Sequence, residues 1–221
     1  LSAKKGKKPL RACQFCGNKP HPVFMSARQK IEGLKALAER GSAFAQTILG
    51  CHYRDGRDGV REDPMTAARL LQQAVDQGCT SACVRLADLL LGVGGSYSNY
   101  DESGYQGVPL DDESGVRLMA LAAEAGHPLA QYNVGFMLRH GTNGLKRRPL
   151  AAMAWFAHAV SNGNEAAKKE YALTDASLMS LGLDFNVSAL KSVLNKVPTA
   201  ASVMQAMSRG RRTGTGTVKL E

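Results

Sequence analysis

The chain has 221 residues, of which 44% are hydrophobic and only 6% are aromatic. Alanine is frequent and blocks of Val, Ile and Thr are scarce, a composition that favours helices and excludes a large β-sandwich or barrel. No apolar run approaches the ~18 residues that a membrane span requires, and the lysine-rich start lacks the apolar core of a secretory signal. We therefore expect an intracellular, cytoplasmic protein with no membrane contact.

The net charge of +9 is unevenly distributed along the chain. Residues 1–30 contain eight Lys and Arg and no acid, and residues 191–221 contain six against one acid, which leaves 14 basic and 18 acidic residues in 31–190. A mildly acidic body between two basic ends does not fit a nucleic-acid-binding domain, so nucleic acid is expected to contact only the ends, if anything. The five cysteines, an odd number, do not fit a secreted disulfide framework.

The first segment, residues 1–25, is predicted to be a basic arm. It contains Cys13 and Cys16 in a C-x-x-C pair, with His21 five residues further on. Two thiolates at this spacing can bind one Zn²⁺, but a closed structural site needs four ligands. We take Cys13, Cys16 and His21 as candidate zinc ligands, with ordinary free thiols as the alternative, and we expect no other cofactor.

A repeated block follows and is the strongest pattern in the chain. Similar blocks begin at Ala45, Ala82 and Ala130. The glycines that end the blocks are 37 residues apart in two intervals and 48 apart in the middle one, which is one period plus an insertion of 11. Self-similarity at such a period is typical of stacked helical repeats, each of which buries its apolar face against the next.

The first half of each block is predicted to be a helix, because apolar residues recur at three- and four-residue spacing. These helices are expected over 43–53, 81–91 and 129–139. Gly50, Ala87 and Gly135 hold equivalent positions in them. Glycine is costly inside a helix, so we expect the backbone of a neighbouring helix to come close at these positions.

A turn and a second helix complete each block. The turns are expected at Gly59-Val60, Gly107-Val108 and Gly144-Leu145, where glycine permits a positive φ. Asp63 and Asp111 are predicted N-caps, and Arg148 is a weaker cap. The second helices are expected over 64–77, 112–125 and 149–162. They carry apolar residues at two sets of matched positions, namely Leu70, Leu118 and Trp155, and then Leu71, Met119 and Phe156.

The pattern extends by one helix on each side of the blocks. Ser26 is a good N-cap for a helix over about 27–40, and a last helix is expected over about 164–173. About eight helices over 26–173, with an insertion loop at 92–107, therefore predict an all-α solenoid.

These residues also carry a family resemblance. The run A-Q-x-x-L-G-x-x-Y at 45–53, followed by G-V at 59–60 and D-P at 63–64, resembles the Sel1-like repeat, a relative of the tetratricopeptide repeat. The block that begins AQYNVG at 130–135 is similar, whereas the second block departs from the pattern at Cys83. The resemblance implies an α-solenoid of helix-turn-helix repeats with capping helices. It implies a non-enzymatic adaptor that binds a protein or peptide on its surface.

The C-x-x-C segment looks similar to the closing pair of a RING-type or MYND-type zinc finger. In that case the chain would be the end of a longer product. This resemblance implies an alternative function, in which the repeats form the substrate-recognition part of a ubiquitin-ligase-type protein. The pattern S-x-x-K at Ser188 and Lys191 matches a serine hydrolase motif at two positions only. The other catalytic motifs are missing, so no enzyme activity is expected.

Two irregular segments remain. The insertion loop combines Gly and Ser with Tyr97, Tyr100 and Tyr105, which are candidate partner-binding residues because large amphipathic rings are frequent binding hot spots. The alternative is a tolerated spacer between two helices. Residues 174–208 are predicted to form two or three short capping helices, or else a detachable segment that another protein recruits. Residues 209–221 are predicted to be a disordered basic tail.

Overall fold

The computed structural model of the chain describes residues 26–92, 105, 107–180 and 199–207. Within these residues the chain forms helices only, apart from one isolated antiparallel bridge between Leu145 and Met207. The helices are α1 (Ala27–Glu39), α2 (Ala43–Asp55), α3 (Pro64–Asp76), α4 (Thr80–Leu90), α5 (Asp112–Glu124), α6 (Pro128–His140), α7 (Pro149–Ser161), α8 (Ala166–Ser180) and α10 (Ala200–Met204). The expected basic arm, the basic tail and most of the insertion loop lie outside the described residues.

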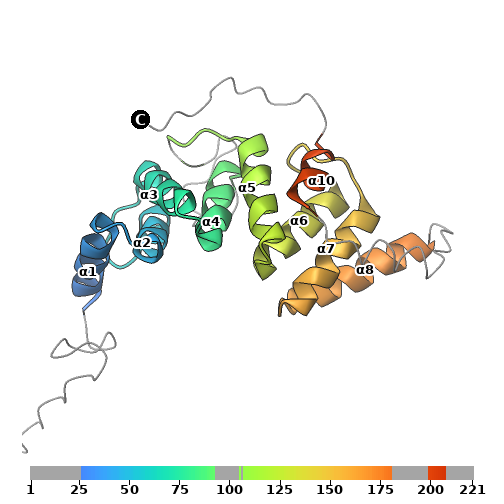
Figure 1. Cartoon of the computed structure of the whole chain (residues 1–221), viewed down its shortest axis with the longest axis horizontal. Helices are drawn as coiled ribbons and strands as arrows, with labels where there is room; N and C mark the ends of the chain where they lie inside the picture. Colours follow the sequence, from blue (N-terminus) through green and yellow to red (C-terminus); the bar gives the residue numbers. More distant parts are fainter. Residues whose placement is uncertain (1–25, 93–104, 106, 181–198, 208–221) are drawn as a thin grey trace, which may run out of the picture.

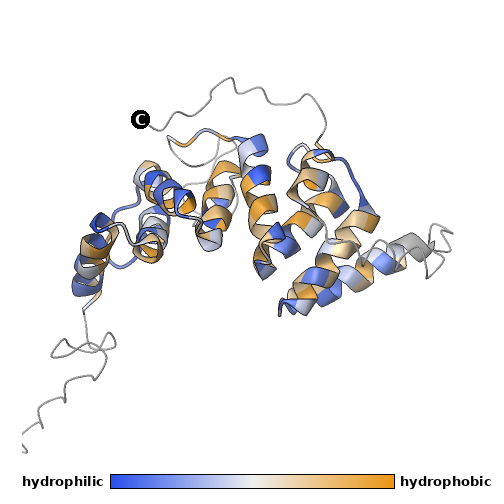
Figure 2. Cartoon of the chain, in the orientation of Figure 1, coloured by the Kyte–Doolittle hydropathy of each residue, from blue (hydrophilic) through white to orange (hydrophobic). Residues whose placement is uncertain are grey.

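Helices α1 to α8 follow one another along the long axis of the molecule (Figure 1). The most extensive contacts join α2 to α3, α4 to α5, and α6 to α7, which are the three predicted helix pairs. Helices such as α1, α3 and α4 show a hydrophobic and a hydrophilic side (Figure 2), because apolar residues at three- and four-residue spacing gather on one face. The predicted all-α solenoid is therefore confirmed.

The predicted caps begin the helices at the expected places. The side chain of Ser26 accepts a hydrogen bond from the backbone of Gln29, and Asp63 and Asp111 each accept one from the backbone three residues later, at 3.0 Å. Arg148 makes no side-chain cap hydrogen bond, as its residue type predicts. The amide groups at the start of a helix lack partners within the helix, so these caps define where α1, α3 and α5 begin.

The small residues of the first helices face large side chains of the second helices. A Cβ atom at Gly50 would lie 2.9 Å from Leu71 Cγ, and one at Gly135 would lie 2.7 Å from Phe156 Cε1. The close approach is thus confirmed, but the neighbour is mainly a side chain and not the helix backbone that we expected. The reason is that the second helix projects its largest matched side chain into the space that the missing Cβ leaves.

The core is divided along the stack, as expected of a repeat protein. Three clusters of buried residues follow one another, and half-buried side chains join them: Tyr53 packs against the first and second clusters, and Val75 and Leu118 pack against the second and third. Each repeat therefore buries its apolar surface mainly against its neighbours, and stability depends on local interfaces.

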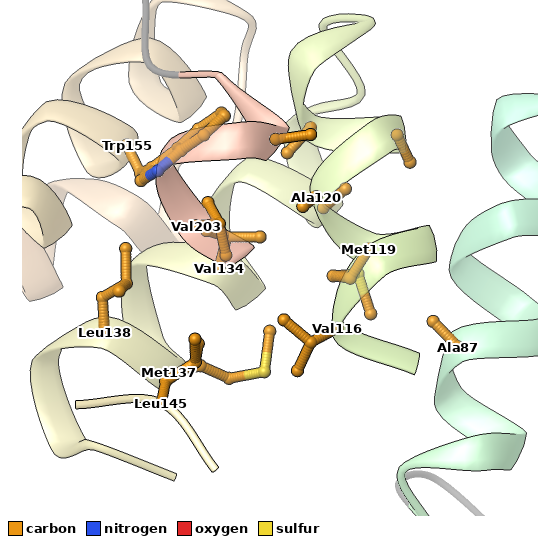
Figure 3. Packing of buried hydrophobic residues seen from close by; sticks show 14 of the residues in the cluster. Ala87, Val116, Met119, Ala120, Val134, Met137, Leu138, Leu145, Trp155 and Val203 are labelled. Carbon is orange, nitrogen blue, oxygen red and sulfur yellow. The ribbon is translucent and has the colours of Figure 1, made fainter. Parts of the chain in front are cut away.

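The C-terminal part returns to the side of the stack. The main packing partner of α10 is α5, and not the last helix of the series, α8. The backbone N–H of Ala200 donates to Glu124 Oε2 at 3.1 Å, and the backbone N–H of Lys146 donates to the carbonyl of Ala206 at 2.7 Å. Val203 is 1% exposed and lies beside Val134 in the largest core cluster (Figure 3). This helix completes the core around α5 to α7.

Candidate functional site

The first helices of the repeats present solvent-exposed apolar side chains on one face. Neighbouring first helices contact each other, α2 with α4 and α6 with α8. Phe44 on α2 is 71% exposed, Phe136 on α6 is 40% exposed and Leu173 on α8 is 43% exposed. Phe136 and Leu173 are 37 residues apart and hold equivalent positions in consecutive units. We call the surface formed by α2, α4, α6 and α8 the first-helix face.

An aromatic group occupies this face on α6. The ring centroids of Tyr132 and Phe136 are 6.4 Å apart, and those of Phe136 and His140 are 4.4 Å apart. Tyr132 also lies 6.0 Å from the buried Phe156, which anchors the group to the core. Such tilted ring pairs restrain the side chains without hiding them, so Phe136 presents a preorganised apolar surface.

A groove of about 420 Å³ lies on the first-helix face between α2 and α4. Its lining residues are Phe44, Thr47, Ile48, Cys51, His52, Asp55, Arg57, Cys79, Ser81 and Arg85. Cys51 and Asp55 hold the positions on α2 that Phe136 and His140 hold on α6, so the groove belongs to the same face. Burial raises the pKa of the Cys51 thiol, which keeps it protonated and unreactive at neutral pH.

Five charged side chains, three of which line this groove, form an alternating chain. Arg54 donates to Asp55 at 2.6 Å, and Arg57 lies 3.1 Å from the other oxygen of Asp55. Asp88 lies 3.8 Å from Arg54 and 3.5 Å from Arg85. The order is therefore Arg57, Asp55, Arg54, Asp88, Arg85, with a cation at each end, and we call it the charge chain.

Exposure differs along the charge chain. The side chains of Asp55, Asp88 and Arg54 are between 6% and 11% exposed, whereas those of Arg85 and Arg57 are 40% and 71% exposed. Burial raises the pKa of Asp88 to about 6, although the two arginines beside it act in the opposite direction. The acidic groups of the charge chain are thus enclosed and neutralised, and its solvent-exposed charges are positive. An exposed carboxylate near the groove is that of Asp58, which lies 3.6 Å from the lining residue His52.

A second, larger groove of about 840 Å³ lies between α1 and the segment 58–64. Its charged lining residues are of both signs: Arg28, Glu32, Lys35, Asp58, Arg61, Glu62 and Asp63. Arg28 and Glu32 pair with each other at 3.1 Å. This mixed lining favours no ligand of one charge.

The structure corrects the expectation for Tyr105. Its ring is 4% exposed and lies in a core cluster with Leu89 and Val108, so it anchors the end of the insertion loop and offers no surface to a partner. Its hydroxyl is buried without a hydrogen-bond partner, and burial raises the pKa of Tyr105 to about 12. Tyr97 and Tyr100 lie outside the described residues, and their role stays a prediction.

The predicted metal ligands cannot be compared with the structure, because Cys13, Cys16 and His21 lie outside the described residues. Within the part that is described, no three His, Cys, Asp or Glu side chains come together as a metal site. Cys83 is buried and Cys79 is half-buried against Thr47, so both are small residues of the repeat packing. The zinc-finger alternative stays a prediction.

No helix in the described ranges is both long enough and apolar enough to cross a membrane. The expected cytoplasmic location stays a prediction.

Sequence reasoning missed the first-helix face and the charge chain. Phe44 and Phe136 carry a detectable signal, since each lies on the polar side of an otherwise amphipathic helix. Arg54, Asp55 and Asp88 carry no such signal, because the sequence does not show that charged residues on different helices lie close together in space.

Comparison with known proteins identifies the repeats. The family model described as "Sel1 repeat" matches residues 43–79, 80–127 and 128–164. The chain is 27% identical over 161 residues to chitin synthase regulator SKT5 of Saccharomyces cerevisiae, covering 72% of this chain and 21% of that protein. It is 31% identical over 148 residues to chitin synthase regulatory factor 3 of Schizosaccharomyces pombe, covering 66% and 15%. The chain thus spans about a fifth or less of the length of these relatives.

Two solved structures are similar. A Sel1 repeat protein from Oxalobacter formigenes is 30% identical, with a TM-score of 0.49, over 64% of this chain and 96% of that one. The antigen c5321 of uropathogenic Escherichia coli is 20% identical, with a TM-score of 0.49, over 91% and 47%. Because the family model covers more than half of the residues in three consecutive copies, the chain belongs to the Sel1 repeat family.

Proposed function

We propose that this chain is a non-enzymatic adaptor that binds a segment of a partner protein on its first-helix face. The observation that carries the proposal is the exposure of Phe44, Phe136 and Leu173 on three of the four first helices, α2, α6 and α8. Exposing large apolar side chains to water costs free energy, and contiguous patches of them on a protein surface mark sites of protein association. A stack of packed helices also holds them in place before binding, so little order has to be gained on association.

The names of the relatives support a proposal for the class of partner. Chitin synthase regulator SKT5 and chitin synthase regulatory factor 3 are named for the control of chitin synthase. We therefore propose that the partner is a polypeptide of a chitin synthase assembly, meaning the enzyme or another protein that controls it. In such an assembly the repeats would hold two proteins together and carry out no reaction themselves.

Proximity labelling in the native cell tests this proposal. The double variant Phe44→Ala and Phe136→Ala removes the two exposed rings of the first-helix face. The matched control is Met65→Ala with Leu121→Ala, because these side chains are 45% and 48% exposed but lie on second helices. Loss of labelled partners, a chitin synthase component among them, in the first variant alone is the expected result. Partners that are lost only in the control, or in neither variant, would show that the first-helix face is not the binding surface.

A further inference from the structure

The α2–α4 groove combines an apolar wall with two exposed cations. Phe44 and Ile48 lie one helical turn apart on α2, and Cys51 lies one turn further along the same face. Arg57 lies beyond the end of α2, and Arg85 lies on the facing helix α4. The lining of the groove therefore offers apolar side chains from α2 together with two guanidinium groups.

The charge chain fixes the positions of these two arginines. Asp55 holds Arg57 at 3.1 Å and Asp88 holds Arg85 at 3.5 Å, while Arg54 lies between the two carboxylates. An unpaired surface arginine samples many rotamers and loses that freedom on binding, whereas these two are already restrained. Their outer N–H groups stay available, since a guanidinium has five donors and a single carboxylate uses at most two.

The net charge of the charge chain is positive. Three arginines and two aspartates leave one positive charge, and both aspartates are enclosed while the terminal arginines are open to solvent. A basic peptide would meet the exposed cations first and be repelled. An acidic segment is attracted over a distance and then pairs with the arginines at both ends of the charge chain.

We propose that the α2–α4 groove binds an acidic segment of the partner protein, with a bulky apolar side chain placed between Phe44, Ile48 and Cys51 and neighbouring carboxylates paired with Arg57 and Arg85. This inference rests on the proposed adaptor function and specifies the chemistry of what the first-helix face binds. The planar guanidinium group matches a carboxylate in shape as well as in charge, so the two arginines both attract carboxylates and select for them.

A peptide selection tests the inference with the full chain. Random short peptides displayed on phage are selected on the immobilised protein, and the enriched peptides are synthesised with a fluorescent label. The expected result is enrichment of Asp and Glu around a Leu, Phe or Trp residue. The affinity, measured by fluorescence anisotropy, should weaken as salt concentration rises, because the arginine pairs are screened. Enrichment of basic or uncharged peptides, or no enrichment, would overturn the inference.

Variants then locate the site. Arg57→Gln together with Arg85→Gln should weaken binding of the selected peptide by about tenfold or more, since two charge-assisted contacts are lost. Phe44→Ala should weaken it by about tenfold through loss of the apolar contact. The matched control is Arg117→Gln on α5, an arginine that is 57% exposed and paired at i,i+4 with Glu113, as surface arginines commonly are. This control should change the affinity by less than about twofold.

Folding of each variant is verified by its thermal melting curve. If Arg85→Gln melts early, Arg57→Gln and Phe44→Ala carry the test alone, because both side chains are 71% exposed and their loss leaves the core intact. Equal binding to wild type and to these variants would overturn the assignment of the groove.

The outcomes separate this inference from the adaptor proposal. Binding that is lost only in Phe136→Ala overturns the groove assignment and keeps the first-helix face as a binding surface. Binding that persists in every first-helix variant overturns both. A single-stranded oligonucleotide probe serves as a third arm, and its binding with the same variant dependence, without any peptide binding, would overturn the inference in favour of a nucleic acid.

Discussion

Gln131 and Asn162 join the two helices of the third repeat through a hydrogen bond from Asn162 Nδ2 to Gln131 Oε1, at 2.9 Å. The amide nitrogen of the same Gln131 donates to the buried carbonyl of Ala123 at 3.0 Å, so this one side chain connects three helices. In the first repeat, Gln46 makes the equivalent pair of bonds, and Gln77 takes the role of Asn162. The first and third repeats are therefore stabilised by a recurring polar contact as well as by apolar packing.

The second repeat lacks both members of this contact. Cys83 stands at the position of Gln131, and Ala125 stands at the position of Asn162. Replacing both partners by small groups avoids leaving a buried polar atom without a hydrogen bond, which is the costly outcome. This pairing gives the departure at Cys83 a physical reason, since the two differences compensate each other.

The first prediction is that the two positions are energetically coupled. Gln131→Cys alone should lower the free energy of unfolding by about 1 kcal/mol, because two hydrogen bonds are lost while the carbonyl of Ala123 still accepts from the backbone N–H of Gly126 at 3.0 Å. The double variant Gln131→Cys with Asn162→Ala should lose less stability than the sum of the losses in the two single variants. Urea unfolding of the four proteins measures this coupling, and strictly additive effects would show that the contact is not cooperative.

The second prediction concerns the close approach at Gly135. Gly135→Ala should destabilise the protein by about 1–2 kcal/mol, because overpacking against Phe156 exceeds the gain in helix propensity. Gly33→Ala is the matched control, since no atom lies within 4 Å of the added Cβ, and it should be neutral or stabilise by up to about 1 kcal/mol. Thermal and urea unfolding distinguish the two.

The second repeat also suggests a rescue of Gly135→Ala. Its natural combination is Ala87 with Met119 in one core cluster, as Figure 3 shows. Adding Phe156→Met to Gly135→Ala recreates that combination with a flexible side chain, and should recover part of the lost stability. A further loss would mean that the clash with Phe156 is not the cause.

The third prediction follows from the buried carboxyl of Asp88. Its pKa is raised from 3.8 to about 6 in the folded state, so between these values the folded protein binds more protons than the unfolded one. The contribution of Asp88 to the free energy of unfolding is therefore greatest below about pH 4, falls by on the order of 2–3 kcal/mol as the pH rises to about 6, and is constant above that.

Asp88→Asn isolates this effect from other titrating groups. The difference in unfolding free energy between wild type and variant, measured by urea unfolding from pH 4 to pH 7.5, should decrease as the pH rises. A difference that increases with pH would mean that Arg54 and Arg85 dominate over burial and hold the pKa low.

The fourth prediction tests the core role of Tyr105. Tyr105→Phe should leave stability unchanged or raise it by up to about 1 kcal/mol, because the hydroxyl is buried without a partner. Tyr105→Ala should cost about 3–5 kcal/mol through loss of packing against Leu89 and Val108. The large loss in Tyr105→Ala is not expected of an exposed residue, and a loss above about 1 kcal/mol in Tyr105→Phe would reveal a hydrogen bond to its hydroxyl.

The elements of this fold were predictable because their signals are local. A cap such as Asp63 acts on an amide three residues away, and the apolar spacing of a helix is set by its own geometry. The period of 37 residues then made the stacking order predictable, since a repeat that cannot bury its apolar face alone has to pack on its neighbour. The course of α10 was not predictable, because its contacts with Glu124 and Lys146 link positions far apart in the sequence.

The amino-acid sequence by itself determined the family, the helical class and the order of the repeats, because all three depend on patterns that recur within one period. The tertiary structure decided which side chains face solvent together. Tyr105 looked like a surface residue in a polar loop and is buried, whereas Phe44 lies in a helix that was predicted only to pack against its neighbours and is exposed. Likewise, the charges that meet at the α2–α4 groove come from α2, α4 and the turn after α2, and only the packing of these elements converts separate surface charges into one unit.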